Sequence, residues 1–259
     1  MAAEAGTPAH PVGVDFGGSG IKAALVDTEE GSFVGDRVRI ETPVPATPER
    51  VASVVRSLLD TLDETTDAPV GVTVPAIVKQ GIVGSAANID KRWVGVDAEH
   101  LFCDALGRPV SVMNDADAAG YAEVRLGAAK DHEGLVIVTT LGTGIGTALV
   151  FDGVLVPNSE LGHLEIDGHD AETRAAASVR EKKDLSYEEW AKRLTRYYSE
   201  LEKLFSPDLF VVGGGVSKNA DRFLHLIDVK TPIVAATLLN QAGIVGAALL
   251  ASEAAHSPR

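Results

Sequence analysis

A glycine-rich turn between two short apolar segments occurs twice in this chain, and no other feature constrains the fold as strongly. The first copy runs from Val12 to Asp27, with the turn Gly-Gly-Ser-Gly at its centre. In the second copy, apolar residues 135–140 and 147–152 flank the turn 141–146. An apolar segment, a glycine turn and a second apolar segment are typical of a β-hairpin. The sequence therefore predicts two hairpins.

The two hairpins align at one constant offset, which is close to half of the 259 residues. The aligned pairs are Asp15 with Thr140, Gly17 with Gly142, Ala23 with Ala148, and Asp27 with Asp152. Matched units at half-length spacing indicate an internal repeat. We expect two similar α/β domains, residues 1–116 joined by a C-terminal helix 240–255, and residues 117–259.

Other segments fit an α/β fold, because buried strands alternate with amphipathic helices. Thr47-Pro48 predicts a helix start with proline in the first turn, and Ser186-x-x-Glu189 predicts a capping box at the start of a second helix. The other expected strands are Val70–Val74, Val110–Met113 and Leu209–Val212, and the other expected helices are Asp115–Leu126, Lys218–Leu226 and Asn240–Ser252.

Composition and charge exclude several classes of partner. The formal net charge of −14 repels nucleic acid and anionic membranes as general partners. The single cysteine, Cys103, excludes an intramolecular disulfide framework and a cysteine-cluster zinc site. Residues 1–11 lack the features of a signal peptide, and no apolar run is long enough to span a membrane. We therefore expect a cytoplasmic protein.

Both glycine turns are candidate phosphate sites, because glycine lets backbone N–H groups approach a phosphate closely. In the first turn these residues are Asp15, Gly17, Gly18, Ser19, Gly20 and Lys22, and in the second they are Thr140, Gly142, Thr143 and Gly144. The Asp15 carboxylate is suited to holding Mg²⁺ through water. One such turn alone is more typical of an ordinary hairpin, whereas two turns suit phosphoryl transfer, which needs charge neutralised on several oxygens.

A third glycine turn, Gly213, Gly214 and Gly215, follows the strand Leu209–Val212 and precedes an expected helix. A helix start attracts anions, which suits a phosphoryl donor. A tight connection between a strand and a helix explains the pattern equally well.

Asn114 and Asp115 lie where a strand ends and a helix begins, the edge at which open α/β sheets bind ligands. Asp115 has two interpretations: it caps the helix, or it accepts the proton of an attacking hydroxyl.

Glu160, His163 and Asn88 offer the hydrogen-bonding groups that recognise a sugar, since hydroxyls both donate and accept. For the segment of Glu160 and His163 alone, a satisfied histidine beside a solvated glutamate is the interpretation that we favour.

Taken together and in this order, these segments resemble the ROK family of sugar kinases and sugar-responsive repressors. The segments that carry the resemblance are Asp15–Lys22, Asn114-Asp115, Gly142–Gly146, Glu160-Leu-Gly-His163 and Gly213–Gly215. The resemblance implies an actin-like, hexokinase-type (ribonuclease H-like) fold with duplicated domains facing across a cleft. It also implies a catalytic base at Asp115 and a sugar site formed by Asn88, Asn114, Asp115, Glu160 and His163.

The chain departs from the family pattern after His163, where the family has a zinc-binding cysteine cluster that ends in a sugar-binding glutamate. No cysteine is present there, so we expect no structural zinc, and we assign the glutamate to Glu172. This zinc-free form resembles the family's polyphosphate-using glucokinases. The resemblance implies glucose as acceptor, polyphosphate and possibly ATP as donor, Mg²⁺, a place in glycolysis and a homodimer.

A polyanionic donor raises the question of how a chain with a charge of −14 attracts it. Eight cations lie within residues 174–203: Arg174, Arg180, Lys182, Lys183, Lys192, Arg193, Arg196 and Lys203. A solvated helix face explains them, because six acidic residues share the stretch. Our hypothesis is that Arg180, Lys182 and Lys183 form part of a polyphosphate track.

Two rival functions remain open. The first is an ATP-dependent glucokinase or another hexose kinase. The second is a sugar-sensing regulator, which would need a DNA-binding domain before the first glycine turn. That turn begins too close to Met1 to leave room for one, so we favour the enzyme.

Overall fold

The computed structural model describes residues 10–62, 67–87 and 89–256. The chain divides into two compact units, one formed by residues up to Met113 together with Ala247 onward, and the other by Asn114–Gly246. Asn88 lies outside the described residues.

The first unit is built on a five-stranded sheet in the order β3-β2-β1-β4-β7. Its strands are β1 (Val12–Phe16), β2 (Ile21–Asp27), β3 (Ser32–Ile40), β4 (Val70–Val74) and β7 (Val110–Asn114). Strand β1 pairs antiparallel with β2 and parallel with β4. The predicted first hairpin is therefore confirmed, and it lies in the middle of the sheet.

Two helices of the first unit have clear start signals. Helix α1 (Pro48–Leu59) is capped by the Thr47 hydroxyl, which accepts from the N–H of Arg50, as the sequence predicted. Helix α2 (Ala98–Leu106) begins at the Asp97 cap and ends at Gly107, whose φ of +68° suits glycine. The core of this unit gathers apolar residues of the sheet and of both helices around the buried Trp93.

The second unit repeats the sheet arrangement of the first, with the order β10-β9-β8-β13-β14. Its strands are β8 (Leu135–Leu141), β9 (Ile145–Phe151), β10 (Val154–Val156), β13 (Leu209–Gly213) and β14 (Ile233–Ala235). In both units a glycine-turn hairpin is followed by an added antiparallel strand, and a later strand returns parallel to the first one. The predicted duplication is confirmed at the level of topology.

The constant offset between the two hairpins holds for only one strand of each. Asp15 pairs with Lys22 across the first hairpin, whereas Thr140 pairs with Gly146 across the second. The second turn is therefore one residue shorter, so the alignment of Ala23 with Ala148 moves by one position. The sequence alignment was wrong at this point because it matched Ala23 with Ala148 by identity, and identity of two residues does not reveal the length of the turn before them.

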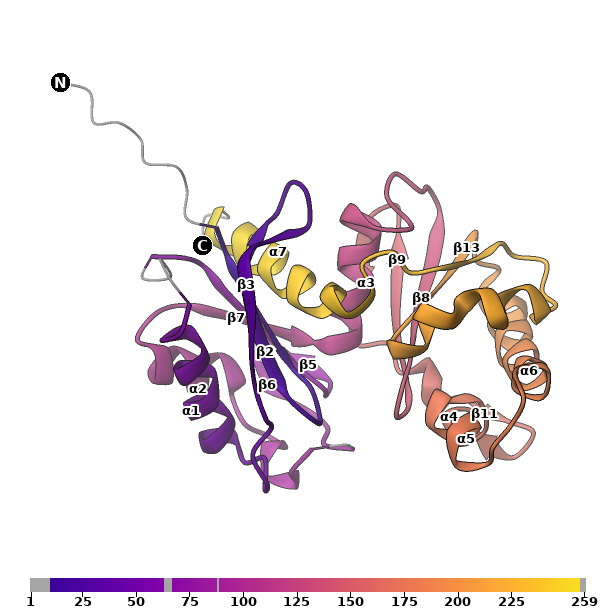
Figure 1. The fold of residues 1–259 in the computed structure, drawn as a ribbon, viewed down its shortest axis with the longest axis horizontal. Coiled ribbons are helices and arrows are strands. Elements are labelled where there is room, and N and C mark those ends of the chain that lie inside the picture. The colour runs from indigo at the N-terminus through magenta and orange to yellow at the C-terminus, as the bar shows by residue number, and fades with distance from the viewer. Residues whose placement is uncertain (1–9, 63–66, 88, 257–259) are drawn as a thin grey trace. The chain divides into compact units, whose positions relative to one another are not determined.

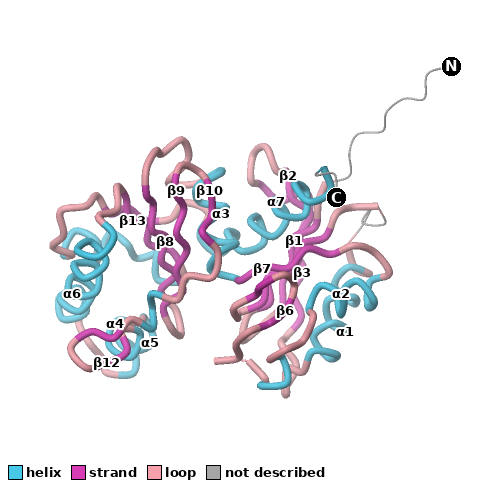
Figure 2. The backbone as a smooth tube through the Cα atoms, turned by 180° about the vertical axis from the view of Figure 1, so that it is seen from behind, coloured by secondary structure: helices cyan, strands magenta, loops and turns pink. Residues whose placement is uncertain are grey.

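The sheet of the second unit is covered on both faces, as Figure 1 and Figure 2 show for α3 and α6. Val136 and Val138 of β8 belong to the same apolar cluster as Val124 of α3 (Asp115–Leu126), whereas Ile137 belongs to the cluster that includes Trp190 of α6 (Tyr187–Phe205). Alternate residues of a strand point to opposite faces, so β8 separates two cores.

Helix α6 begins with the predicted capping box: Ser186 accepts from the N–H of Glu189, whose carboxylate accepts from the N–H of Ser186. Between β10 and α6 the chain forms short elements only. They are the 3₁₀ helix η2 (Leu161–His163), the strands β11 (Glu165–Ile166) and β12 (His169–Asp170), and the helices α4 (Glu172–Ala175) and α5 (Ala177–Lys182).

Two predicted helices differ in the structure. Residues 218–226 do not form an α-helix but two 3₁₀ segments, η3 (Gly215–Arg222) and η4 (Leu224–Leu226), because Asn219 has non-helical dihedral angles that interrupt the coil. The closing helix α7 covers Ala242–His256, so it begins two residues later than expected. Among the described residues, no helix is both long and apolar enough to cross a membrane.

Candidate active site

Strand β7 ends at Asn114, and this residue starts helix α3. Its side-chain oxygen accepts from the N–H groups of Ala116 (2.8 Å) and Asp117 (3.0 Å), which makes Asn114 the N-cap. Asp115 is the first helical residue, half-buried, and its Oδ1 accepts from the N–H of Ala116. The two interpretations of Asp115 are thus separated: Asn114 caps the helix, and Asp115 is held at its positive end.

The second glycine turn packs against this helix start. Gly146 has no room for a side chain, because a Cβ there would lie 2.8 Å from the Cβ of Ala116 and 2.5 Å from the hydroxyl of Thr140. Gly142 and Thr143 at the tip are exposed, and a Cβ on Gly142 would meet nothing within 4 Å. The turn is therefore open at its tip, while Gly146 packs on the start of the helix that carries Asp115.

Helix η2 carries Glu160 and His163 to the same place. Gly162 lies directly on strand β9, since a Cβ on it would be 2.0 Å from the carbonyl oxygen of Ile145. Thr147 fixes the approach, because its hydroxyl donates to the carbonyl of Ser159 and accepts from the N–H of Leu161. A close backbone contact and a buried threonine thus position the segment that the sequence singled out.

Glu172, which we assigned only by analogy, lies within this group. One of its carboxylate oxygens accepts from the N–H of Ile145 (3.1 Å), and the other is 4.0 Å from His163 Nδ1. The first oxygen also occupies the space beside Gly144, where a Cβ would be 2.2 Å away. Glu172 therefore joins the glycine turn to the histidine.

Asp170 holds the ring of His163 in place, a contact that sequence reasoning missed. His163 Nδ1 donates to Asp170 Oδ2 at 2.8 Å, and the carboxylate fixes the proton on that nitrogen. Within the described residues, His163, Asp170 and Glu172 could each give one ligand atom to a metal ion, and these atoms lie within 4.8 Å of one another. All three are at least partly exposed.

Glu160 and His163 both have raised pKa values, for different reasons. Burial raises the pKa of Glu160, and the charge of Glu172 raises it further, although His163 lowers it. The hydrogen bond to Asp170 raises the pKa of His163, with smaller contributions from Glu172 and Glu160. The three carboxylates around His163 therefore favour the positively charged form of its imidazole ring.

Replacing Asp170 with asparagine should lower the pKa of His163, because the charged hydrogen-bond partner is lost while Glu160 and Glu172 remain. NMR titration of the His163 ring measures this directly. Asp167→Asn is the comparison. It changes a carboxylate of the same hairpin that is bound by Arg196, and it should leave the pKa of His163 unchanged. An unchanged midpoint in the Asp170 variant would contradict the assignment.

Asp117 is a second residue that the sequence analysis missed. It is 2% exposed, and its Oδ2 accepts from the N–H of Asn158 at 2.7 Å, while among the described residues Oδ1 has no hydrogen-bond partner. Burial raises its pKa to about 6. The bond to Asn158 ties helix α3 to the loop that leads to Glu160. In the sequence Asp117 looks like any acidic residue in a first helical turn.

Asp117→Asn should flatten the pH dependence of stability. Because the folded pKa is raised, the folded state binds more protons than the unfolded state between pH 4 and 6, so wild-type stability falls as pH rises through that window. A shift of this size corresponds to a loss of about 3 kcal/mol of folding stability, and the loss is complete above about pH 6. Urea unfolding from pH 4 to 8 checks this, and parallel curves for the two proteins would refute it.

The third glycine turn comes directly after β13 and packs closely against the end of β8. A Cβ on Gly214, whose φ is +83°, would lie 2.4 Å from the carbonyl oxygen of Leu141, whereas Gly215 is open. The Ser217 hydroxyl donates to the carbonyl of Gly214. Gly213 to Gly215 are thus brought next to the end of the strand that enters the second turn.

The first glycine turn belongs to the other unit. There Lys22 Nζ lies 2.9 Å from Asp15 Oδ2, and the hydroxyl of Thr73 donates to Asp15 Oδ1 at 3.4 Å. Arg39 of β3, which we did not predict, donates to the carbonyl of Ser19 and covers Gly20, where a Cβ would be 2.4 Å from its guanidinium. The sequence did not single out Arg39, because one charged residue in a polar edge strand forms no motif.

The residues of the expected polyphosphate track lie on and after α5. The Arg180 guanidinium lies 3.9 Å from the ring centroid of Tyr187, on whose ring Arg222 also lies, at 4.3 Å. Lys182 and Lys183 are exposed. Helix α5 begins beside the second glycine turn, because the N–H of Ser178 donates to the carbonyl of Gly142.

The family model described as "ROK family" matches residues 11–178. The chain belongs to the ROK family. It is 48% identical over 244 residues to the polyphosphate glucokinase of Mycobacterium tuberculosis strain CDC 1551, a match that covers 94% of this chain and 91% of the relative.

Two solved structures have the same fold as this chain. The inorganic polyphosphate/ATP-glucomannokinase from Arthrobacter sp. strain KM has a TM-score of 0.91 and 53% identity, covering 95% of this chain and 99% of that one. A ROK family glucokinase from Streptomyces griseus, in complex with glucose and AMPPNP, has a TM-score of 0.81 and 27% identity, covering 94% and 99%. This ROK chain therefore has the actin-like fold expected from its sequence.

Proposed function

We propose that this ROK protein is a polyphosphate-dependent glucokinase, which transfers the terminal phosphoryl group of polyphosphate to the 6-hydroxyl of glucose. One observation carries the proposal: in a single unit, Gly146 packs on the start of α3 beside Asp115, and Glu172 links the same turn to His163. A carboxylate, an open phosphate turn and a sugar-type group are the parts of a sugar kinase. The names of the mycobacterial and Arthrobacter relatives supply the donor and acceptor.

In this proposal Asp115 is the general base. Its carboxylate orients the 6-hydroxyl and takes its proton while the oxygen attacks phosphorus, a role that needs position more than basicity. Asn114 keeps the helix start in shape by capping it. The side chains that bind the sugar ring are Asn88, Asn114, Glu160, His163 and Glu172.

The glycine turns bind the donor. From the second unit, the phosphates contact Thr140, Gly142, Thr143 and Gly144. Gly142 contributes an open surface without a side chain, because its own N–H donates to the carbonyl of Gly144, and the threonines contribute their hydroxyls. Gly213 to Gly215 supply a further turn at the end of β13. In the first unit the corresponding residues are Asp15, Gly17, Gly18, Ser19, Gly20 and Lys22. We add Arg39 to this proposed set, because its guanidinium donates to the carbonyl of Ser19 in the same turn.

The Asp15 carboxylate, with the Thr73 hydroxyl beside it, is the hard-oxygen set that Mg²⁺ prefers, so Asp15 would hold the ion through water. When bound, Mg²⁺ neutralises charge on the phosphates. Lys22, in contact with the same carboxylate, provides a second positive charge at the turn. The proposal includes a homodimer, testable by sedimentation, and a cytoplasmic place in glycolysis.

Arg180, Lys182 and Lys183 are proposed as a track for the donor chain as it leaves the second turn, because α5 starts at that turn. Changing Lys182 and Lys183 together to glutamine should raise the KM for long-chain polyphosphate about tenfold at low salt, with a smaller effect at high salt where charges are screened. Steady-state kinetics at two salt concentrations measure it. An unchanged KM at both would place the track elsewhere.

A coupled assay for glucose 6-phosphate, with polyphosphate and ATP supplied separately, tests the proposed function. Product from purified polyphosphate without nucleotide is the expected result. Product from ATP alone would favour the rival ATP-dependent hexose kinase. Glucose binding without product from either donor would favour the sugar-sensing regulator.

A further inference from the structure

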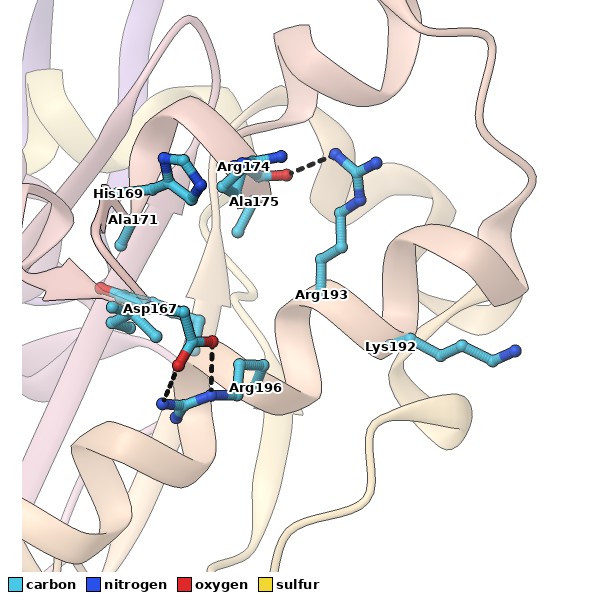
Figure 3. A pocket seen from close by; sticks show the side chains of 10 residues that line it. Asp167, His169, Ala171, Arg174, Ala175, Lys192, Arg193 and Arg196 are labelled. Carbon is cyan, nitrogen blue, oxygen red and sulfur yellow. Dashed lines mark hydrogen bonds and ion pairs between the residues drawn. The ribbon is translucent and has the colours of Figure 1, made fainter.

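A basic pocket of about 460 Å³ lies in the second unit, on the far side of the segment that holds His163. Figure 3 shows the residues that line it, which come from the β11–β12 hairpin, α4 and α6. Ala171 forms part of its wall, and its neighbours in sequence, Asp170 and Glu172, contact His163. The volume is in the usual range for small-molecule sites.

The lining carries an excess of positive charge in a protein of net charge −14. The cationic or titratable groups are His169, Arg174, Lys192, Arg193 and Arg196. Arg196 is already paired with the one lining carboxylate, Asp167, through two bonds of 3.0 Å. Within the part of the chain that the structure describes, no ion pair involves Arg174, Lys192 or Arg193.

Two arginines approach each other at the rim of this pocket. Arg193 donates to the backbone carbonyl of Arg174 at 3.2 Å, so its guanidinium lies beside the start of the other arginine's side chain. His169 and Arg174 both line the pocket, and in Figure 3 the ammonium of Lys192 extends away from the other labelled side chains. Arginine side chains that line a pocket and have no carboxylate partner are suited to binding an anion.

The floor of the pocket is the apolar core of this unit. Ile166, Ala175 and Tyr197 line the pocket and belong to the core cluster that includes Trp190, and Tyr197 is 1% exposed. The groups that can meet an anion are therefore the cationic side chains of the lining.

We propose that this pocket binds phosphate groups, with Arg174 and Arg193 as their main contacts, and that the groups belong to the part of the polyphosphate donor far from the transferred phosphate. This source rests on the proposed function. Helix α4 connects the two places, because Glu172 at its start contacts the second glycine turn and Arg174, two residues on, lines the pocket. A donor that spans both would be held by more charges than one confined to the turn.

The kinetic test compares donors of different length with the variant Arg174→Gln/Arg193→Gln. The KM for long-chain polyphosphate should rise about tenfold, whereas the KM for ATP and for tripolyphosphate should change less than about twofold. Lys130→Gln/Lys230→Gln removes two exposed positive charges from the same unit and is the matched control for net charge. Circular dichroism and thermal unfolding confirm that each variant folds.

A binding measurement distinguishes the source of the phosphate. Calorimetric titration with inorganic phosphate and with tripolyphosphate is carried out in saturating glucose and a non-hydrolysable ATP analogue, which occupy the reaction site. Loss of this binding in the arginine variant, without a change in the length dependence of KM, would support the pocket and assign it to a free phosphate compound.

An arginine variant that matches both the wild type and the lysine control in kinetics and in calorimetry would overturn the proposal. If the wild-type protein makes no product from any polyphosphate, the proposed function fails, and the calorimetric titration still decides whether the pocket binds phosphate.

Discussion

Replacing Asp115 with asparagine should lower kcat by about 10²–10⁴, the usual contribution of a general base, while glucose still binds. The amide has the shape of the carboxylate, and its oxygen can still accept from the N–H of Ala116, so the helix start is retained. The amide cannot take the proton of the 6-hydroxyl. Steady-state kinetics and a calorimetric measurement of glucose affinity separate the two effects.

Asp104→Asn is the comparison for this variant, because it makes the same chemical change at a largely exposed carboxylate of α2. It should have wild-type turnover. Near-normal kcat in the Asp115 variant would remove this residue from the chemistry. A parallel loss of glucose affinity and turnover would instead make Asp115 a sugar-binding residue without a role in proton transfer.

Gly162→Ala should disrupt the proposed sugar site through the backbone. The added Cβ would lie 2.0 Å from the carbonyl oxygen of Ile145, and a backbone atom of a paired strand cannot turn aside as a flexible side chain can. Either η2 moves away, taking Glu160 and His163 with it, or the start of β9 is displaced. We expect the KM for glucose to rise at least tenfold and the free energy of unfolding to fall by about 1–3 kcal/mol.

Gly84→Ala provides the control, because a Cβ at Gly84 meets nothing closer than 3.5 Å and the residue does not have a positive φ. Its urea unfolding curve should match that of the wild type. If Gly162→Ala had a normal KM for glucose, the close contact between η2 and β9 would not be what positions Glu160 and His163.

The elements with strong local signals could be predicted from the sequence. Thr47 with Pro48, and Ser186 with Glu189, fix helix starts through contacts within one turn, and these starts are where the structure has them. The two hairpins were visible because glycine turns and apolar strands are local patterns. Asp115 could be singled out for the same reason, since it lies where a strand ends and a helix begins.

The rest of the site depends on contacts between residues distant in sequence. Asp117 became notable only when Asn158 was found to donate to it, and Asp170 only when the β11–β12 hairpin carried it to His163. Arg39 lies in a strand whose residues are mostly exposed, so no apolar alternation marked it. The expected helix over 218–226 was wrong in type, because its residues favour a helical coil that Asn219 interrupts.

The shared strand order has an evolutionary consequence. In both units one long connection leaves the third antiparallel strand and returns to a strand parallel with the first. The earlier copy uses it for a single described helix, α1, whereas the later copy places there η2, the β11–β12 hairpin and α4 to α6. After a gene duplication, this one connection can gain new elements while both sheets stay intact. The proposed sugar residues Glu160, His163 and Glu172 all lie on this connection of the later copy, so grafting it between relatives tests whether it sets the acceptor.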